Sequence, residues 1–448
     1  MNTTTDIRSR VEAQFQSSVN SLIDLVAIPS VSADSFDQST LETSAQWIAQ
    51  KFSALGFDTE VIHHVTPDGL QGRPAILAHR EGEEGKPTVL LYAHHDVQPQ
   101  GDEALWHTDP YRAQRIGERL YGRGAADDKA GVMLHIAAIE AADPGVGITV
   151  FIEGEEEIGS PTFASFLETY KDRLAADVIV VADSSNWKVG TPSLTTSLRG
   201  VVTLDVTIKV LDHALHSGMY SGPVLDAVTI ASRLITTLHD DAGEVAVDGL
   251  LGSNDTDVDY PEDELRQDMG ILPGVELAGS GSLTSRLWMK PTITVIGMDV
   301  TSVARASNTL LPEVTFSLSL RVAPMQDPAQ AAAAVKRHLE SHVPFGAHIA
   351  VTITDQGPGF ISDGNTETTH IAKWALGEAW GTEPVDIGVG GSIPFISDFK
   401  RVIPQAQILV TGVEDPDSRA HSANESLHLG DWQNAIVAEA LLLSKLGE

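Results

Sequence analysis

The sequence contains no cysteine, which excludes disulfides, thiolate zinc sites and cysteine nucleophiles together. Long hydrophobic runs are also missing, and no segment approaches the length of a membrane-spanning helix. Residues 1–20 are polar and lack the apolar stretch of a secretion signal. We therefore expect a cytoplasmic protein that makes no use of a membrane.

Basic residues are scarce as well. The 448 residues include 29 Lys and Arg against 62 Asp and Glu, so the formal net charge is −33. Such a surface repels nucleic acid and anionic membranes and attracts cations. We expect no nucleic-acid partner, and the net charge gives no information on the substrate.

The apolar segment 89–93 predicts a strand that ends at a histidine and a carboxylate. Side chains two residues apart leave a strand on the same face, so His94 and Asp96 can act as a pair. One ring nitrogen of His94 can bind a metal ion while Asp96 accepts a hydrogen bond from the other, which fixes the tautomer. A lone His-x-Asp would more often be a polar strand end without chemistry.

A glycine-rich turn, residues 121–131, lies between a short apolar run and a helical stretch. Its glycines can place Asp127 at the tip of a sharp loop. The turn lacks the Gly-x-x-x-x-Gly-Lys-Ser/Thr spacing of a phosphate-binding loop. As the alternative to metal binding, Asp127 or Asp128 could cap the following helix.

Three more segments carry candidate ligands. The predicted strand 148–152 runs into four glutamates within residues 153–157, and so many carboxylates are costly to place together without a cation. Asp183 ends another predicted strand, and His421 follows a late one. Taken singly, these could be a solvated acidic loop, a turn aspartate and a surface histidine. Together, the segments predict a two-metal hydrolase centre at the strand ends of an α/β sheet.

In the order and type of these motifs the chain resembles the di-zinc peptidase and deacylase family that contains carnosinase-like dipeptidases, glutamate carboxypeptidase, acetylornithine deacetylase and succinyl-diaminopimelate desuccinylase. The resemblance implies two divalent ions per subunit, zinc before manganese or cobalt. It also implies a role for each motif residue: His94 and Asp183 on one ion, Glu157 and His421 on the other, Asp127 bridging both, Asp96 as the partner of His94 and Glu156 as general base.

The chemistry of these residue types agrees with the resemblance. Two divalent ions about 4 Å apart can bind a water between them, lower its pKa towards about 7 and polarise a scissile carbonyl. Glu156 would take the proton of this water and return it to the leaving amine. Imidazole and carboxylate ligands suit zinc, manganese or cobalt. The family also tends to have a cis peptide bond after its bridging aspartate, which predicts one between Asp127 and Asp128.

The length predicts two domains, because 448 residues exceed one ordinary core. Alternating helical and strand patterns up to residue 198 predict an α/β catalytic domain with a helix-covered mixed sheet, which resumes at 363–448. Residues 199–362 predict a separate α+β domain with four strands and two helices. By resemblance this insertion is a lid and dimerisation domain, so a homodimer is expected.

The predicted lid carries His216, which matches the family's lid histidine. In these enzymes that residue reaches the partner subunit's site and stabilises the oxyanion, and a donor placed where negative charge develops is a large catalytic contribution. A turn histidine is the alternative for His216 when the motif is taken alone.

Further residues are candidates for binding the C-terminal carboxylate of a substrate. The guanidinium of Arg321 can donate two parallel hydrogen bonds to a carboxylate, although a surface strand arginine is the alternative. Gly391 and Ser392 offer backbone N–H groups and a hydroxyl. By resemblance these residues hold the carboxylate, with Thr309 contributing across the dimer.

The chain departs from the family pattern at two positions without losing a ligand. Ala130 stands where many relatives have glycine, and His95 places an extra imidazole beside the ligand motif. The acidic stretch 240–289 is longer than is usual for a structureless loop. In its length and in the adjoining segment 286–295, the chain resembles the carnosinase-like branch.

The sequence therefore predicts a two-metal hydrolase of dipeptides or short peptides with a free C-terminal carboxylate. One alternative keeps the site but cleaves N-acyl or N-carbamoyl amino acids. Another is a non-catalytic dimeric binding protein, whose signature would be degenerate ligands, and all five ligand positions and Glu156 are intact here.

Overall fold

A computed structural model describes residues 4–142, 144–391 and 394–448 of the chain. The chain divides into two compact units. The first unit comprises Met1–Thr196, Ser362–Ile387 and Asp398–Glu448, and the second comprises Ser197–Ile361 and Gly388–Ser397. The short segment Gly388–Ser397 falls within the predicted catalytic range 363–448, whereas its contacts group it with the second unit.

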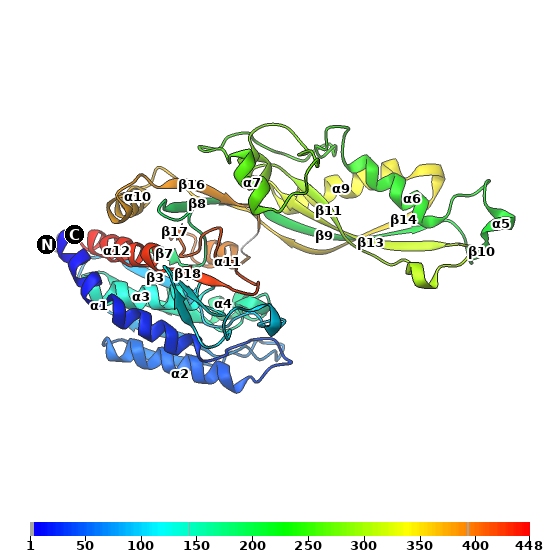
Figure 1. Ribbon diagram of the computed structural model, residues 1–448. Helices are drawn as coiled ribbons and strands as arrows, with labels where there is room; N and C mark the ends of the chain where they lie inside the picture. The colour runs from blue at the N-terminus through cyan, green and yellow to red at the C-terminus, as the bar shows by residue number, and fades with distance from the viewer. Residues whose placement is uncertain (1–3, 143, 392–393) are drawn as a thin grey trace. The chain divides into compact units, whose positions relative to one another are not determined.

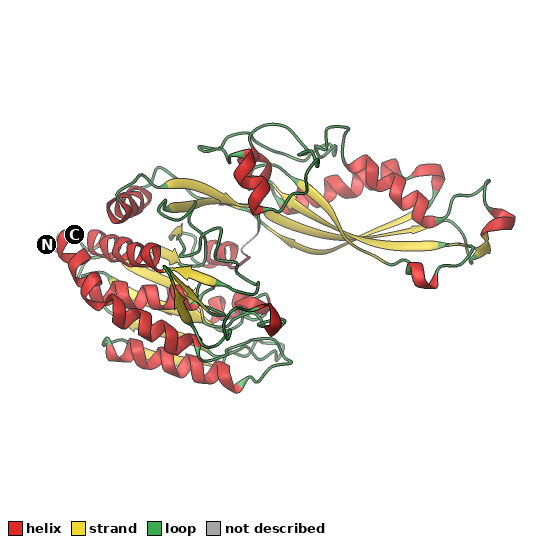
Figure 2. Ribbon diagram, viewed as in Figure 1, coloured by secondary structure: helices red, strands yellow, loops and turns green. Residues whose placement is uncertain are grey.

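A mixed sheet forms the centre of the first unit (Figures 1 and 2). Within the described residues it has 9 strands in the order β1-β2-β6-β3-β7-β17-β8-β15, and β16 also pairs with β8. Strands β6, β3, β7 and β17 are parallel, and β1 and β2 are antiparallel. This arrangement confirms the predicted α/β class. The strands are β1 (Asp58–Ile62), β2 (Ala75–Arg80), β3 (Thr88–His94), β6 (Gly147–Glu153), β7 (Val178–Val181), β8 (Ser193–Leu198), β15 (Phe360–Ile361), β16 (Val385–Val389) and β17 (Gln407–Val410).

Helices of the first unit cover both faces of this sheet. The side chains of β3 show this, because alternate residues enter two different sets of contacts. Val89 and Leu91 join the main hydrophobic cluster, whereas Tyr92 makes edge-to-face contacts with Phe163 and Phe399. The main cluster contains residues of α1 (Thr4–Val26), α2 (Ser39–Ala54), α3 (Lys129–Ala142), α10 (Glu367–Trp380) and α12 (Leu429–Leu446), and the aromatic set contains residues of α4 (Phe163–Leu174) and α11 (Pro394–Val402).

A small sheet joins two segments that are far apart in the sequence. Its order is β18-β5-β4, formed by β4 (Gln114–Ile116), β5 (Arg119–Tyr121) and β18 (Ser426–His428). Ser426 pairs with Tyr121 in this sheet. Because the glycine-rich turn follows β5 and the His421 segment precedes β18, the pairing brings these two motifs together.

The second unit contains the predicted four-stranded sheet, antiparallel and ordered β11-β13-β9-β14. The alternate residues Val202, Leu204, Val206 and Ile208 of β9 are buried, as expected when helices cover only one face. These residues and the helices α6 and α9 share one hydrophobic cluster. The elements are β9 (Gly200–Lys209), α6 (Ala227–Ile235), β11 (Thr292–Met298), β13 (Glu313–Val322), α9 (Pro328–His342) and β14 (His348–Gly357).

The remaining elements of the second unit are short. The long acidic stretch is not structureless, because it contains α7 (Glu262–Asp268) and α8 (Leu283–Trp288). Strands β10 (Leu215–His216) and β12 (Thr309–Leu310) form a small pair, and α5 (Ser217–Tyr220) follows β10.

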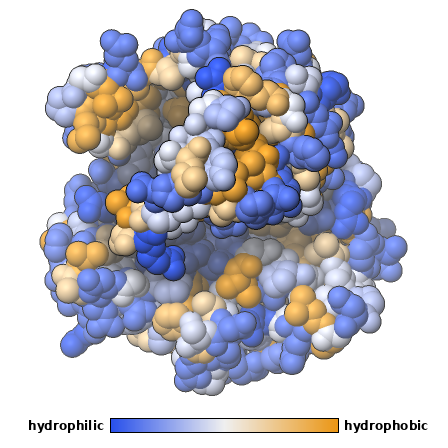
Figure 3. Space-filling view, turned by 90° about the vertical axis from the view of Figure 1, so that its right-hand side faces the viewer, coloured by the Kyte–Doolittle hydropathy of each residue, from blue (hydrophilic) through white to orange (hydrophobic). Residues whose placement is uncertain are grey.

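Polar residues cover most of the face seen in Figure 3, with apolar residues in scattered patches. Among the helices in the described part of the chain, none combines the length and the hydrophobicity needed to cross a membrane.

Candidate metal centre

Parallel strands bring three motifs to one edge of the first unit's sheet. Strand β3 lies between β6 and β7 and is parallel to both. The carboxyl ends of these strands therefore meet at the same edge, where open α/β sheets form their sites. His94 is the last residue of β3, the glutamates follow β6, and Asp183 follows β7.

The predicted ligands form two groups that share one aspartate. His94, Asp127 and Asp183 make one group, and Asp127, Glu157 and His421 make the other. Within each group, the candidate ligand atoms lie within 4.8 Å of one another. Each group combines imidazole nitrogen with carboxylate oxygen and contains no sulfur, which fits zinc, manganese or cobalt. The structure thus places all five predicted ligand residues together.

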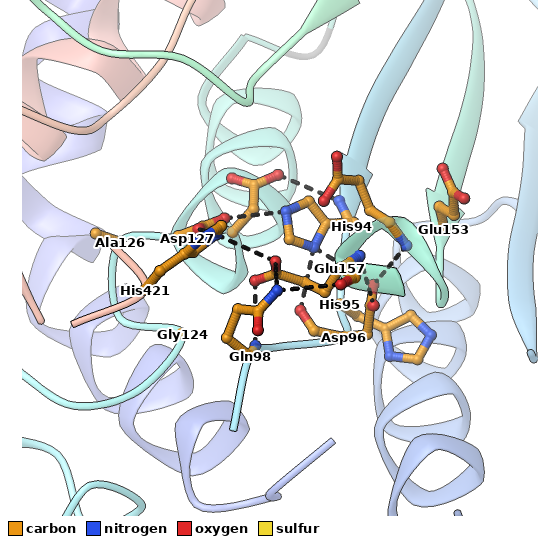
Figure 4. Close-up of polar contacts among 12 residues, drawn as sticks. His94, His95, Asp96, Gln98, Gly124, Ala126, Asp127, Glu153, Glu157 and His421 are labelled. Carbon is orange, nitrogen blue, oxygen red and sulfur yellow. Dashed lines mark hydrogen bonds and ion pairs between the residues drawn. The ribbon is translucent and has the colours of Figure 1, made fainter. Parts of the chain in front are cut away.

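The two oxygens of the Asp127 carboxylate face different histidines (Figure 4). Asp127 Oδ1 lies 3.1 Å from His94 Nε2, and Asp127 Oδ2 lies 3.0 Å from His421 Nε2. His421 Nε2 is also 3.1 Å from Glu157 Oε2. The peptide bond between Asp127 and Asp128 is cis, as predicted. A carboxylate with one oxygen directed to each group has the geometry of a bridging ligand.

Electrostatics show that the two groups attract positive charge. Hydrogen bonds to Asp127 and Glu157 raise the pKa of His421 to about 11. Burial, followed by the charge of Asp127, raises the pKa of Asp183 to about 6. Burial opposes ionisation of Asp127 as well, but hydrogen bonds with His421 and His94 bring its pKa below the ordinary value. The site therefore holds excess negative charge that protons or metal ions can neutralise.

Glu156, the predicted general base, lies beside the two groups in the short 3-10 turn Glu156–Ile158. Burial, with the charges of Asp183 and Glu157, raises its pKa to about 9. A carboxyl group whose pKa is shifted upward at a cluster of ligands is a recurrent feature of acid–base sites.

Asp96 was predicted to orient His94, and in the structure it contacts both His94 and the acidic loop. His94 Nδ1 lies 3.4 Å from Asp96 Oδ1 and 3.1 Å from the Asp96 carbonyl oxygen. The Asp96 carboxylate also accepts the backbone N–H groups of Glu156, over 3.2 Å, and Glu157, over 3.0 Å. Asp96 therefore joins the end of β3 to the acidic loop as well as contacting the histidine.

Sequence reasoning missed two residues that hold the ligands. The side-chain amide of Gln98 donates to Glu157 Oε2, and the carboxylate of Glu425 accepts the backbone N–H of Asp127. Gln98 could have been found, because it continues the alternation of His94 and Asp96. Glu425 gave no such signal, since its partners lie about 300 residues earlier in the chain.

The extra imidazole of His95 does not join either metal-ligand group. Its Nε2 lies 2.9 Å from the Pro74 carbonyl oxygen, and its Nδ1 lies 3.1 Å from Ser44 Oγ. Burial lowers the pKa of His95 to about 4, so the ring is neutral near pH 7. Alternation along the chain directs His95 away from the side on which His94 lies.

The remaining predicted residues belong to the second unit. His216 and Thr309 are exposed and face each other as a pair in the β10-β12 ladder. Arg321 lies near the end of β13, and Gly391 follows β16. Ser392 lies outside the described residues. The roles of these residues toward a substrate stay predictions.

Comparisons with known proteins agree with the fold and with a metal-dependent peptidase. The family model described as Peptidase family M20/M25/M40 matches residues 90–445. A cysteinylglycine-S-conjugate dipeptidase of Corynebacterium striatum is 32% identical over 418 residues, 91% of each chain. A human Beta-Ala-His dipeptidase is 29% identical over 387 residues, covering 81% of this chain and 76% of its own.

Solved structures of peptidases have a similar fold. Human carnosine dipeptidase 1 superposes with a TM-score of 0.80 at 25% identity, covering 99% of this chain and 98% of its own. The metallo-carboxypeptidase Sso-CP2 from Sulfolobus solfataricus superposes with a TM-score of 0.79 at 23% identity, covering 96% and 99%, and this likeness concerns the fold.

Proposed function

This chain belongs to peptidase family M20/M25/M40, and from that premise we propose that it is a two-metal dipeptidase. It hydrolyses the amide bond of dipeptides or short peptides that carry a free C-terminal carboxylate. The observation that carries the proposal is the shared aspartate, because Asp127 directs one oxygen to each of two ligand groups.

His94 with Asp183 would hold one ion and Glu157 with His421 the other, while Asp127 would contribute to both sites. When bound, a pair of divalent ions supplies an acidified water and a polarised carbonyl. Zinc is the expected metal, and manganese and cobalt suit the same donors.

Glu156 moves the proton in this proposal. Its carboxylate accepts a proton from the attacking water and returns it to the nitrogen of the leaving amine. The hydrogen bond from the Glu156 backbone N–H to Asp96 fixes the position of the residue. Positive charge bound at the neighbouring ligands opposes the upward shift of its pKa, so that Glu156 can act as a base near neutral pH.

The second unit supplies substrate contacts. Arg321, with Gly391, Ser392 and Thr309, binds the C-terminal carboxylate, and His216 donates to the oxyanion that forms at the scissile carbon. His216 and Thr309 act together, since they are cross-strand partners. The assembly is a homodimer formed through the second unit, and the location is cytoplasmic.

A matched substrate panel tests the proposal. The protein is treated with a chelator and then assayed after addition of zinc, manganese or cobalt, on cysteinylglycine and β-alanylhistidine and on the N-acyl amino acids N-acetylcysteine and N-acetylhistidine. We expect activity that depends on the added ion and that favours the dipeptides. Turnover of the N-acetyl amino acids alone would replace the dipeptidase with an N-acyl amino acid hydrolase, and inactivity with every metal would support a binding protein.

A further inference from the structure

Glu425 is a fully buried carboxylate that contacts the glycine-rich turn with both of its oxygens. Glu425 Oε2 accepts hydrogen bonds from Arg123 Nη1, over 2.6 Å, and from the Gly124 N–H, over 3.1 Å. Its Oε1 accepts the N–H groups of Ala126, over 3.0 Å, and Asp127, over 3.1 Å. The side chain is 0% exposed. Four donors of one short turn therefore converge on a single anion.

The backbone sets up this contact. Strand β18 pairs with β5 immediately beside the turn, and the Gly122 N–H donates to the Glu425 carbonyl oxygen over 3.1 Å. Glu425 also lies four positions after His421 in the sequence. One segment therefore supplies a candidate ligand to one group and, through Glu425, anchors the turn that carries the ligand shared by both.

The turn has the chemistry of an anion-binding loop, although the sequence analysis excluded a phosphate-binding motif on spacing. Successive backbone N–H groups in a tight turn form a concave site for an anion. Gly124 adopts a φ of +83°, and a Cβ at this position would come within 2.7 Å of Val97 Cγ1. The turn is thus shaped to close around an anion, and here the protein's own carboxylate occupies it.

Charge makes this contact strong and specific. Hydrogen bonds to an ionised acceptor are about twice as strong as neutral ones, and the Glu425 carboxylate is neutralised by the buried guanidinium of Arg123. Removing the charge would leave Arg123 buried without its partner, which is costly. The turn would then lose the group that fixes the backbone at Asp127.

We propose that Glu425 is the positioning residue of Asp127, holding the turn so that the two carboxylate oxygens reach the two metal sites. This inference rests on the metal centre of the proposed function. Because Asp127 is shared, loss of Glu425 weakens the binding of both ions rather than of one. A merely structural carboxylate would change stability without changing the affinity for metal.

The test compares Glu425→Gln with a matched control, Glu439→Gln. Glu439 is also a buried carboxylate of the first unit, but it pairs with His135, with Oε1 lying 2.9 Å from His135 Nδ1. Zinc affinity is measured by competition with a chromophoric chelator, and cobalt(II) absorption reports the geometry of the ligands. Unfolding is measured on both metal-free variants.

We expect Glu425→Gln to bind both zinc ions about 10- to 100-fold more weakly and to change the cobalt(II) spectrum, while Glu439→Gln binds metal as the unchanged protein does. Equal metal binding by the two variants would overturn the inference. If Glu425→Gln does not fold, Arg123→Lys takes its place, because lysine keeps the charge but loses the guanidinium, whose Nη1 donates to Glu425 and whose Nη2 donates to the Pro99 and Ser422 carbonyl oxygens. That variant should bind both ions more weakly, but by a smaller factor. Unchanged affinity would again overturn the role of Glu425 in positioning Asp127.

The outcome for the unchanged protein separates this inference from the proposed function. If the unchanged protein binds no metal, the metal centre itself is wrong, and the inference is overturned with it. If it binds two ions and Glu425→Gln binds them equally well, only the role of Glu425 is wrong.

Discussion

The side-chain amide of Gln98 donates a hydrogen bond to Glu157 Oε2 over 2.8 Å, while the Gln98 backbone N–H donates to Glu157 Oε1 over 3.1 Å. The same amide donates to the Glu157 carbonyl oxygen over 3.0 Å. Gln98 therefore orients Glu157, which belongs to one of the two metal-ligand groups and not to the other. Removing its side chain should affect the two metal sites unequally.

Gln98→Leu should lower the affinity for one zinc ion about 10- to 100-fold and leave the affinity for the other nearly unchanged. Residues that hydrogen-bond to metal ligands change metal affinity on this scale. A chelator competition should then resolve two separate affinities. Gln100→Leu is the control, since the Gln100 side chain contacts Glu103 and Tyr111 instead. Equal weakening of both ions would contradict an effect confined to Glu157.

Glu156→Gln should lower kcat by at least about 100-fold, as expected for loss of a general base. The variant keeps the backbone N–H that donates to Asp96, so the loop should stay in place. Metal content and thermal stability should therefore match those of the unchanged protein. Unaltered turnover with full metal content would remove Glu156 from the role of base.

The segments that carry the candidate ligands could be predicted from the sequence because each has a local signal, whereas their assignment as metal ligands came from their combination and from the family resemblance. The strand patterns before His94 and Asp183 show that both residues lie at the carboxyl ends of strands. Parallel strands bring these ends to the same edge of the sheet. The α/β class follows from the same alternation of helix and strand. These signals need no knowledge of which segments contact each other.

Other contacts, such as those of Glu425, could not be predicted because they depend on tertiary pairing. Glu425 meets its turn through the β18-β5 ladder, across about 300 residues of sequence. The cross-strand pair of His216 and Thr309 likewise depends on the register of two very short strands. The grouping of Gly388–Ser397 with the second unit has the same origin, since contacts rather than composition assign it.

Glu153 should make the stability of the first unit depend on pH. Burial, with the charges of Asp96 and Glu155, raises its pKa to about 8, and its Oε2 accepts a hydrogen bond from the Tyr92 hydroxyl over 2.7 Å. The folded protein therefore holds a proton that the unfolded chain, with an ordinary carboxyl, releases. This contribution is complete below the ordinary pKa of about 4.3 and is lost as pH rises through about 8.

The measurement is urea unfolding from pH 4 to pH 9 with a chelator present, for the unchanged protein and for Glu153→Gln. In the window between the two pKa values, the unchanged protein should lose about 1.4 kcal/mol per pH unit relative to the variant. The sign is decisive. If the unchanged protein gains stability relative to Glu153→Gln as pH rises, Glu153 is ionised in the folded state.

His216 gives the sharpest test of the second unit's part in catalysis. If it donates to the oxyanion, His216→Ala should lower kcat by about 100- to 1,000-fold, with little change in KM, because the interaction forms only as charge develops. His213→Ala is the matched control: it lies on the same exposed segment, but its imidazole contacts the neighbouring Asp212. Both variants should retain full metal content, since neither residue belongs to a metal-ligand group. An equal and small effect of the two substitutions would make His216 an ordinary surface histidine.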